Sequence, residues 1–386
     1  MGHTVEERLE RCRALAYDTT FPAVRDWKNR HPGGKAVGVF PVYSPVELYH
    51  AGGMLPVAIF GGGNTVDLSH ADSRFVSFVC SISKSTLELG FQGRLKDFDA
   101  LVFHSICDVA RNLSSVFVRN FPEMHIEYIH LAQNPSSRGV VDYLAAEYRR
   151  VRDNLVRVLG VRISDEQVAT SLLAFNAARG KMRDLYAFRQ AHPHLLSTVE
   201  LSQVIRAGLM LPVEETLALL DEVLADLPGR SGRPRDHVRV LVEGAFCEQP
   251  PLGLLEVIEE GGCYIVEDDL ALGWRWFQED VPVDGDPIRA LAEAYVERSV
   301  SSSVRHDWRH KRMDALVAKV RRSGAQAVIF LPAKFCEPAL FDYVLYRQAL
   351  EREGIPHLVV EFEEKMWTFE RTRNEVQTFV ESLLFD

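Results

Sequence analysis

A motif in which a strand is followed by a cysteine and then a helix occurs twice in the sequence. This motif limits the folds that the chain can adopt. In residues 99–111, DALVFHSICDVAR, an apolar run ends just before Cys107 and a helical pattern follows. Such a run is typical of a parallel strand covered on both faces. The second copy of the motif is residues 327–338, AVIFLPAKFCEP, in which Cys336 holds nearly the same position as Cys107 in the first. Ligands of open α/β sheets bind where strands end and helices begin, so the two cysteines predict one shared site.

The remaining apolar patterns indicate a duplicated α/β protein. One expected strand lies in the apolar run before Cys336. The others are at residues 36–40, 57–60, 100–103, 125–131, 237–243, 264–267 and 357–361. The expected helices include one that starts after Pro45 and others at residues 4–30, 75–91, 252–260, 288–322 and 339–352. Strand, crossover and parallel strand form a right-handed unit, so each half is expected to build its own parallel sheet.

Between the two halves the pattern changes to a 3.6-residue period rich in Ala, Leu and Arg. Residues 164–167, SDEQ, have the composition of a helix start with a capping box. Residues 227–236, LPGRSGRPRD, form a linker of Pro, Gly and Arg. We therefore expect an N-terminal α/β domain with a leading helix over 1–139, a helical insert and linker over 140–236, and a C-terminal α/β domain over 237–386.

Composition limits the location and the partners of the chain. Apolar residues make up 47% and charged residues 25%, which is ordinary for a globular protein. No stretch approaches the roughly 18 apolar residues of a membrane helix, and the charged N-terminus lacks the apolar core of a secretion signal. The formal charge of −10 argues against a nucleic-acid surface. We expect a cytoplasmic protein that binds neither membranes nor nucleic acid.

The cysteines are the leading candidates for chemistry. Six cysteines in a long cytosolic chain are expected to be buried thiols or metal ligands rather than disulfides. Cys80, Cys107 and Cys336 form the main set, because thiolates are the soft ligands that iron–sulfur clusters use. Structural burial is the alternative for each of them. Cys247, just after a strand, is a candidate fourth ligand, whereas three ligands alone leave one metal position open. The other two cysteines, Cys12 and Cys263, are expected to be packing residues.

Two polar residues at the same expected sheet edge are candidates for proton transfer. Glu47 begins the helix after Pro45, where its carboxylate either interacts with the helix dipole or serves as an acid. His104 precedes Cys107 by three residues. It either delivers a proton or bonds a cluster sulfur, or it is a buried histidine bonded to the backbone. Asp108 is expected to be a charge at a helix start.

A basic series and a glycine turn give weaker signals. The basic series contains Arg305, His306, Arg309, His310, Lys311 and Arg312. It predicts either a solvated helix face or a clamp on an anionic, phosphate-bearing ligand. Residues 61–64, GGGN, follow a strand but lack a dinucleotide or P-loop pattern. If the activity of this chain requires ATP, another polypeptide is therefore expected to hydrolyse it.

Four stretches carry a family resemblance: residues 40–63, 78–111, 240–273 and 330–363. Together they resemble the family of 2-hydroxyacyl-CoA dehydratase and benzoyl-CoA reductase subunits. In length and in sequence motifs the chain looks most like the smaller, gamma or C-type, subunit of the ATP-dependent reductases. The resemblance implies that Cys80, Cys107 and Cys336 are ligands of a [4Fe-4S] cluster. Cys247 lies outside this shared triad, and Glu47 falls within the family phrase PxELxxAxG.

The resemblance also implies a reaction and partners. Enzymes of this kind reduce benzoyl-CoA, or a substituted analogue, to a cyclic dienoyl-CoA, and the thioester carbonyl accepts charge as a ketyl. The implied partners are a paralogous cluster-bearing subunit, ATPase subunits that activate the electrons, and ferredoxin as their source. Related dehydratases eliminate water from a 2-hydroxyacyl-CoA, and an electron-relay or structural subunit is a further alternative. We therefore expect an iron–sulfur subunit with two flavodoxin-like α/β domains and a helical insert, the cluster lying between the domains.

Overall fold

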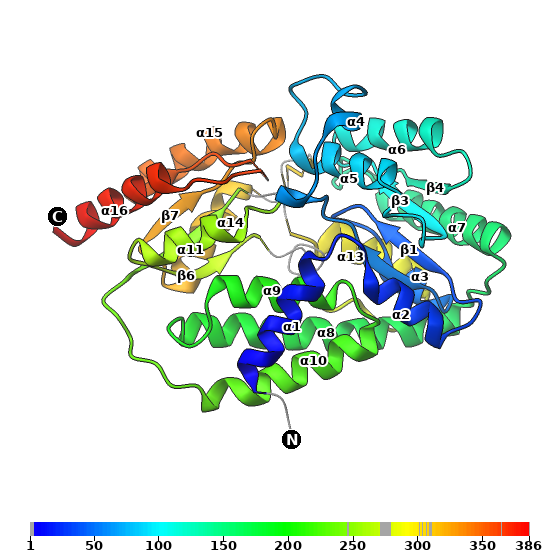
Figure 1. The fold of residues 1–386 in the computed structure, drawn as a ribbon, viewed down its shortest axis with the longest axis horizontal. Coiled ribbons are helices and arrows are strands. Elements are labelled where there is room, and N and C mark those ends of the chain that lie inside the picture. Colours follow the sequence, from blue (N-terminus) through cyan, green and yellow to red (C-terminus); the bar gives the residue numbers. More distant parts are fainter. Residues whose placement is uncertain are drawn as a thin grey trace.

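The chain forms two four-stranded sheets, and all of their strands are parallel (Figure 1). The computed structural model describes residues 4–244, 247–270, 279–300, 302, 304–305, 307–308, 311–363 and 365–385. The first sheet has the order β2-β1-β3-β4, with β1 Ala36–Val39, β2 Leu55–Ala58, β3 Ala100–His104 and β4 His125–Ile129. The second has the order β6-β5-β7-β8, with β5 Val238–Glu243, β6 Cys263–Asp268, β7 Ala327–Phe330 and β8 His357–Val359.

The two sheets have equivalent topologies, which confirms the expected α/β architecture. In each half, the first strand pairs with the second on one side and with the third on the other. This is the order in which flavodoxin-like sheets begin, and ligands bind at the point where the chain reverses direction across the sheet. The reversal lies between β1 and β3 in one sheet and between β5 and β7 in the other.

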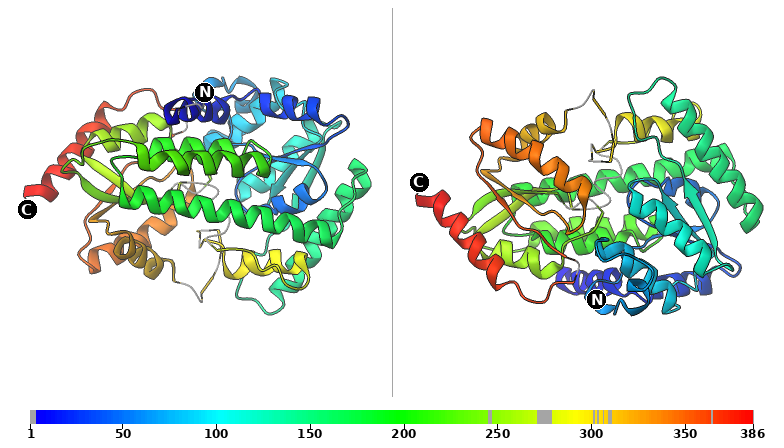
Figure 2. Two further views of the ribbon diagram at one scale, coloured as in Figure 1. Left: turned by 90° about the horizontal axis from the view of Figure 1, so that it is seen from below. Right: turned by 90° about the horizontal axis from the view of Figure 1, so that it is seen from above.

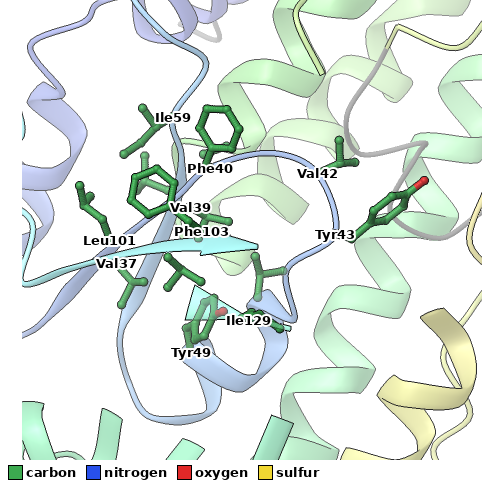
Figure 3. Packing of buried hydrophobic residues seen from close by; sticks show 14 of the residues in the cluster. Val37, Val39, Phe40, Val42, Tyr43, Tyr49, Ile59, Leu101, Phe103 and Ile129 are labelled. Carbon is green, nitrogen blue, oxygen red and sulfur yellow. The ribbon is translucent and has the colours of Figure 1, made fainter. Parts of the chain in front are cut away.

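The centre of the first sheet is packed from both faces. Every residue of β1 and β3 is buried, as expected for parallel strands covered by helices. Figure 3 shows the rings of Phe40 and Phe103 beside this sheet, with centroids 5.7 Å apart. A side chain at Gly38 would bring its Cβ within 2.5 Å of atoms of Ile59 and Leu101. Only glycine therefore allows these neighbours to close over the strand at Gly38.

Helices cover both sheets and fill the region between them. In the first half these are α1 Val5–Tyr17, α2 Pro22–Arg30, α3 Val46–Ala51, α4 Ser69–Asp72, α5 Ser81–Phe91 and α6 Asp108–Asn120. The middle helices are α7 Val140–Leu159, α8 Asp165–Ala191, α9 Thr198–Gly208 and α10 Val213–Asp226. The second half contributes α11 Leu252–Glu260, α13 Pro287–Glu297, α14 Arg312–Ser323, α15 Glu337–Arg352 and α16 Glu370–Phe385.

Several helix boundaries agree with the sequence and others differ from it. The capping box that starts α8 at Ser164 is present, as its sequence predicts. The expected helix over 4–30 is instead two helices, because Phe21 adopts a left-handed conformation between α1 and α2. The expected helix over 75–91 begins only at Ser81. The expected helical stretch over 288–322 contains α13 and α14, with residues 298–311 between them.

Helix α8 connects the two halves of the molecule. It packs against α3 of the first half and against β6 of the second, and it runs across the molecule in Figure 2. Helix α13 comes from the second half of the sequence but packs on α7 beside the first sheet. The Tyr43 hydroxyl adds a link by donating to the carbonyl of Val300 over 3.0 Å. Within the described residues, no helix combines the length and apolar character that crossing a membrane requires.

Candidate functional site

Two of the predicted site cysteines occupy equivalent positions in the two sheets. Cys107 follows β3 and is the N-cap of α6, and Cys336 follows β7 and is the N-cap of α15. Because β3 and β7 hold the same place in their sheets, each cysteine lies at a chain-reversal point. The Cys107 sulfur accepts a hydrogen bond from the amide of Ala110 at 3.4 Å. The prediction that these residues stand at equivalent strand ends is confirmed.

Two further cysteines join them. Cys80 is the N-cap of α5, and Cys247 follows β5, the counterpart of β1. Cys80 and Cys247 are buried within the larger apolar cluster of the first half, and Cys107 and Cys336 pack against it. Cys336 also packs against the core of the second half. The structure thus brings the main cysteine set together with Cys247 where the two halves meet.

The buried thiols interact with one another electrostatically. Burial raises the pKa of Cys80, and nearby acidic groups raise it further, namely Glu248, Cys107 and Cys336. Burial also raises the pKa of Cys247 well above its ordinary value, with contributions from the other three thiols. These shifts keep the thiols protonated at neutral pH. Metal binding has to displace those protons, and the bound cation provides the compensating charge.

Three helix N-termini converge on the cysteines. Cys80, Cys107 and Cys336 each immediately precede the first residue of a helix of 11 residues or more. The amide groups of a first helical turn carry partial positive charge and favour anions. An anionic, thiolate-bound group at this place would therefore be stabilised from both halves of the chain.

The cysteine geometry does not suit a single metal ion. In the described part of the chain, no three His, Cys, Asp or Glu side chains are gathered tightly enough to bind one ion between them. An iron–sulfur cluster is larger, since its thiolates bind different iron atoms. All-sulfur donors with converging helix N-termini fit a cluster of this kind.

Glu248 belongs to this site, although its residue type and spacing did not single it out. Its side chain is 2% exposed, and its carboxylate accepts a hydrogen bond from the amide of Ile82 at 3.1 Å. Ile82 is the second residue of α5, two positions after the Cys80 N-cap. The only sequence signal is an acid immediately after a strand-end cysteine, and its partner lies 166 residues away.

Glu47 lies on α3, at the carboxyl edge of β1. Its side chain is fully buried, and its Oε1 accepts a hydrogen bond from the guanidinium of Arg179 on α8. Its other oxygen, Oε2, has no hydrogen-bond partner among the described residues. Because β1 pairs with β3, Glu47 and Cys107 follow adjacent strands of the first sheet.

His104 is the last residue of β3 and is fully buried. Its Nε2 lies 2.9 Å from the carbonyl oxygen of Phe40, so the protonated nitrogen donates to the neighbouring chain segment. Nδ1 has no hydrogen-bond partner in the described ranges. Burial lowers the pKa of His104 to about 4, and the ring is therefore neutral near pH 7. This geometry favours the backbone-bonded alternative.

His104 gives a testable pH dependence of stability. Between its unfolded pKa of about 6.5 and the folded value, only the unfolded chain binds the proton. The stability contribution is present above pH 6.5 and is lost as the pH falls toward 4. We expect the free energy of unfolding of the metal-free wild type to fall between pH 7.5 and pH 4.5. This fall should be about 2–3 kcal/mol larger than that of the His104→Gln variant over the same range. Urea unfolding of both proteins at each pH measures this difference, and parallel losses would contradict the assignment.

Two arginines of the basic series make structural contacts, whereas Lys311 is exposed. Arg305 is 3% exposed and donates to the carbonyls of Val296 and Ser299, while Arg312 forms an ion pair with Asp342 at 2.6 Å. The solvated-face alternative is therefore wrong for Arg305, because these carbonyls bind its guanidinium inside the protein. His306, Arg309 and His310 lie outside the described residues.

A cleft of about 490 Å³ opens beside the helix that Cys107 caps. It lies at the carboxyl ends of β3 and β4 and is lined by Ser105, Arg111, His130, Arg138 and neighbouring residues. Arg111 is one helical turn beyond Cys107, since its amide donates to the Cys107 carbonyl. The cleft thus contains two guanidinium groups, which can bind anions.

Comparison with known proteins places the chain in a family. The model of the family described as 2-hydroxyglutaryl-CoA dehydratase, D-component, matches residues 41–383. The chain is 35% identical to the C subunit of benzoyl-CoA reductase from Thauera aromatica, over 97% of each chain. It is 32% identical to the beta subunit of lactoyl-CoA dehydratase from Anaerotignum propionicum, over 94% of this chain and 95% of that one.

A more distant relative extends the same pattern. Identity to the beta subunit of (R)-2-hydroxyglutaryl-CoA dehydratase from Acidaminococcus fermentans is 25%, over 92% of this chain and 94% of that one. The names of these relatives describe subunits of multi-subunit enzymes that act on CoA esters. The resemblance in the cysteine-bearing stretches is thus confirmed over nearly the whole length. The chain belongs to the 2-hydroxyglutaryl-CoA dehydratase D-component family, which includes benzoyl-CoA reductase subunits.

Proposed function

We propose that this chain is the iron–sulfur subunit of an ATP-dependent benzoyl-CoA reductase that acts on benzoyl-CoA or a substituted analogue. The observation that carries this proposal is the convergence of three N-capping cysteines from both halves of the chain. The relative from Thauera aromatica supports the choice of reaction. Cys80, Cys107 and Cys336 would hold a [4Fe-4S] cluster, and Cys247 lies beside them as a candidate fourth ligand.

The bound cluster would supply single electrons at low potential to the thioester substrate. The chain's own residues hold and orient the reactants. The helix N-termini at the cysteines stabilise negative charge, and the apolar surroundings of Cys80 and Cys247 exclude water. Arg111 and Arg138 in the adjacent cleft would bind the phosphates of the coenzyme A moiety. The acyl group would then lie on the Cys107 side of the cleft.

We further propose that the chain works in a hetero-oligomer. Its partners would be a related cluster-bearing subunit and ATPase subunits fed by ferredoxin. Subunit names among the relatives support this assembly. Helix α15, which begins after Cys336, exposes an apolar face made of Leu340, Phe341, Val344 and Leu345. The related subunit would lie over this face and so approach the cysteine site.

The proposal is tested with the chain copurified anaerobically with its related partner subunit. Iron and acid-labile sulfide are measured, and Mössbauer spectra are recorded before and after addition of benzoyl-CoA. We expect about four irons per chain, with one iron site shifting when benzoyl-CoA binds. Four irons that do not respond would support an electron-relay subunit instead. Absence of iron in the copurified chain would refute the iron–sulfur assignment.

The second candidate is a 2-hydroxyacyl-CoA dehydratase subunit, which the two dehydratase relatives favour. The same purified complex, supplied with the ATPase subunits, distinguishes the reactions. Reductive formation of a cyclic dienoyl-CoA from benzoyl-CoA, with ATP and reduced ferredoxin present, supports the reductase. Loss of water from lactoyl-CoA or 2-hydroxyglutaryl-CoA, without turnover of benzoyl-CoA, would assign the chain to the dehydratases.

Glu47 is proposed as an acid of this reaction, because its Oε2 is buried without a partner in the described ranges. Glutamine has nearly the same shape but carries no transferable proton. We expect Glu47→Gln to lower turnover about 10²-fold or more per iron-loaded complex, with unchanged iron content. Turnover of benzoyl-CoA and iron analysis measure the two quantities. Unchanged turnover would assign Glu47 only to its ion pair with Arg179.

A further inference from the structure

We propose that Glu248 is a positioning residue of the cysteine site, which caps the helix of Cys80 from the opposite half of the chain and adds a fixed negative charge beside the cluster. The inference rests on the proposed function for its redox consequence.

The capping role follows from how α5 begins. Cys80 is its N-cap, but the Cys80 side chain makes no capping hydrogen bond and lies 3.3 Å from the Ser83 hydroxyl. Glu248 instead supplies the acceptor for the amide of Ile82. N-cap side chains normally accept from an amide in this first turn. The first turn of α5 is thus completed by an acid that directly follows Cys247 in sequence.

This contact joins the two halves at the site itself. Cys80 and Ile82 precede β3 in the first half, whereas Glu248 follows β5 in the second. The helix that Cys107 precedes differs, since α6 is capped by the Cys107 sulfur itself. The hydrogen bond from Ile82 to Glu248 therefore fixes the spacing between Cys80 and the strand-end loop of β5 in a nearly solvent-free place.

The same carboxylate has an electrostatic consequence. The position of Glu248 at the start of α5, where a helix favours an anion, supports an ionised carboxylate. Because Glu248 is 2% exposed, water would screen that charge poorly. Reduction adds negative charge to a cluster, and an adjacent fixed anion disfavours that addition. The potential of a cluster depends on net charge, hydrogen bonding and exposure. Glu248 therefore holds the midpoint potential lower than a neutral residue of the same shape would, which suits electron delivery to a poor acceptor.

Two substitutions separate the capping role from the charge. Glu248→Gln keeps a carbonyl oxygen that can accept from Ile82 and removes the charge. Glu248→Ala removes both. The matched control is Glu88→Gln on the same helix, because Glu88 is also buried and accepts from the amides of His70 and Ala71. The control lies toward the other end of α5.

The experiment uses the anaerobically purified complex and an EPR-monitored redox titration. We expect E248Q to retain wild-type iron and to shift the midpoint to a more positive potential, while E88Q leaves the midpoint unchanged. We expect E248A to lose iron as well, because Cys80 is no longer held in place. A wild-type midpoint in iron-loaded E248Q would overturn the electrostatic role.

Hydrogen exchange on the metal-free chain tests the capping role separately. We expect amides of residues 81–83 to exchange faster in E248A than in wild type and to remain protected in E248Q. Equal protection in all three proteins would overturn the capping role. If the wild-type complex holds no iron, the proposed function and the electrostatic role both fail, while the exchange result still decides whether Glu248 caps α5.

Discussion

Replacing Cys336 by serine is expected to remove most of the iron of the proposed cluster and to abolish the proposed benzoyl-CoA reduction while the chain stays folded. Cys336 is only partly buried, and its side chain makes no capping hydrogen bond to α15. Serine fits an N-cap position well, so the helix retains its start. A serine hydroxyl is a much harder and less acidic ligand than a thiol, and it binds iron–sulfur clusters poorly. Iron analysis, circular dichroism and turnover give the three readouts.

The matched control is Cys12→Ala, which removes a buried thiol of α1 that packs among the middle helices. We expect this variant to keep its full iron content. Normal iron in Cys336→Ser would remove Cys336 from the ligand set. Cys247→Ser completes the series. If this variant retains its iron, the cluster has three cysteine ligands and an exchangeable position. If the variant loses iron, Cys247 is the fourth ligand.

Arg189→Leu is expected to destabilise the chain by about 3–5 kcal/mol, because it leaves a buried carboxylate without its cation. Arg189 on α8 is completely buried and forms an ion pair with Asp268 at the end of β6. It also donates to the Thr198 hydroxyl at 3.2 Å, and its guanidinium lies over the Tyr186 ring. The leucine variant retains much of the apolar volume, so the loss reports mainly the missing charge. Urea unfolding of the metal-free chain measures it.

The control for this prediction is the surface ion pair of Arg373 and Glu260, in which both side chains are exposed to solvent. We expect Arg373→Leu to change the free energy of unfolding by less than about 1 kcal/mol. A loss in Arg189→Leu no larger than in this control would contradict the assignment. Asp268→Asn in the Arg189→Leu background should recover part of the stability, because the uncompensated charge is then gone.

Much of the fold could be predicted because its strands are short and buried on both faces. The apolar runs of β3 and β7 are bounded by polar residues, and each is followed by a cysteine and a helix. These local features also predicted that Cys107 and Cys336 stand at equivalent strand ends. Helix α11 was predicted with the bounds that the structure has, because Pro251 and Gly261 flank it.

The parts that were missed depend on contacts between distant segments. The sequence predicts too early a start for α5, since the apolar pattern continues from Phe75 through the loop before Cys80. The sequence shows no sign that Glu248 caps this helix from the other half. The ion pair between Glu47 and Arg179 joins residues 132 positions apart, and only the packing of α3 on α8 brings them together.

Helix α8 has a consequence for electron transfer under the proposed function. It holds the first half through the pair of Arg179 with Glu47 and the second half through the pair of Arg189 with Asp268. The two arginines are 10 residues apart on one helix, or about 15 Å along its axis. Separating the halves would strip a buried charge of its partner. Such a frame would limit rearrangement around the cysteine site, so under the proposed function the protein's share of the reorganisation energy would be small and electron transfer would be fast.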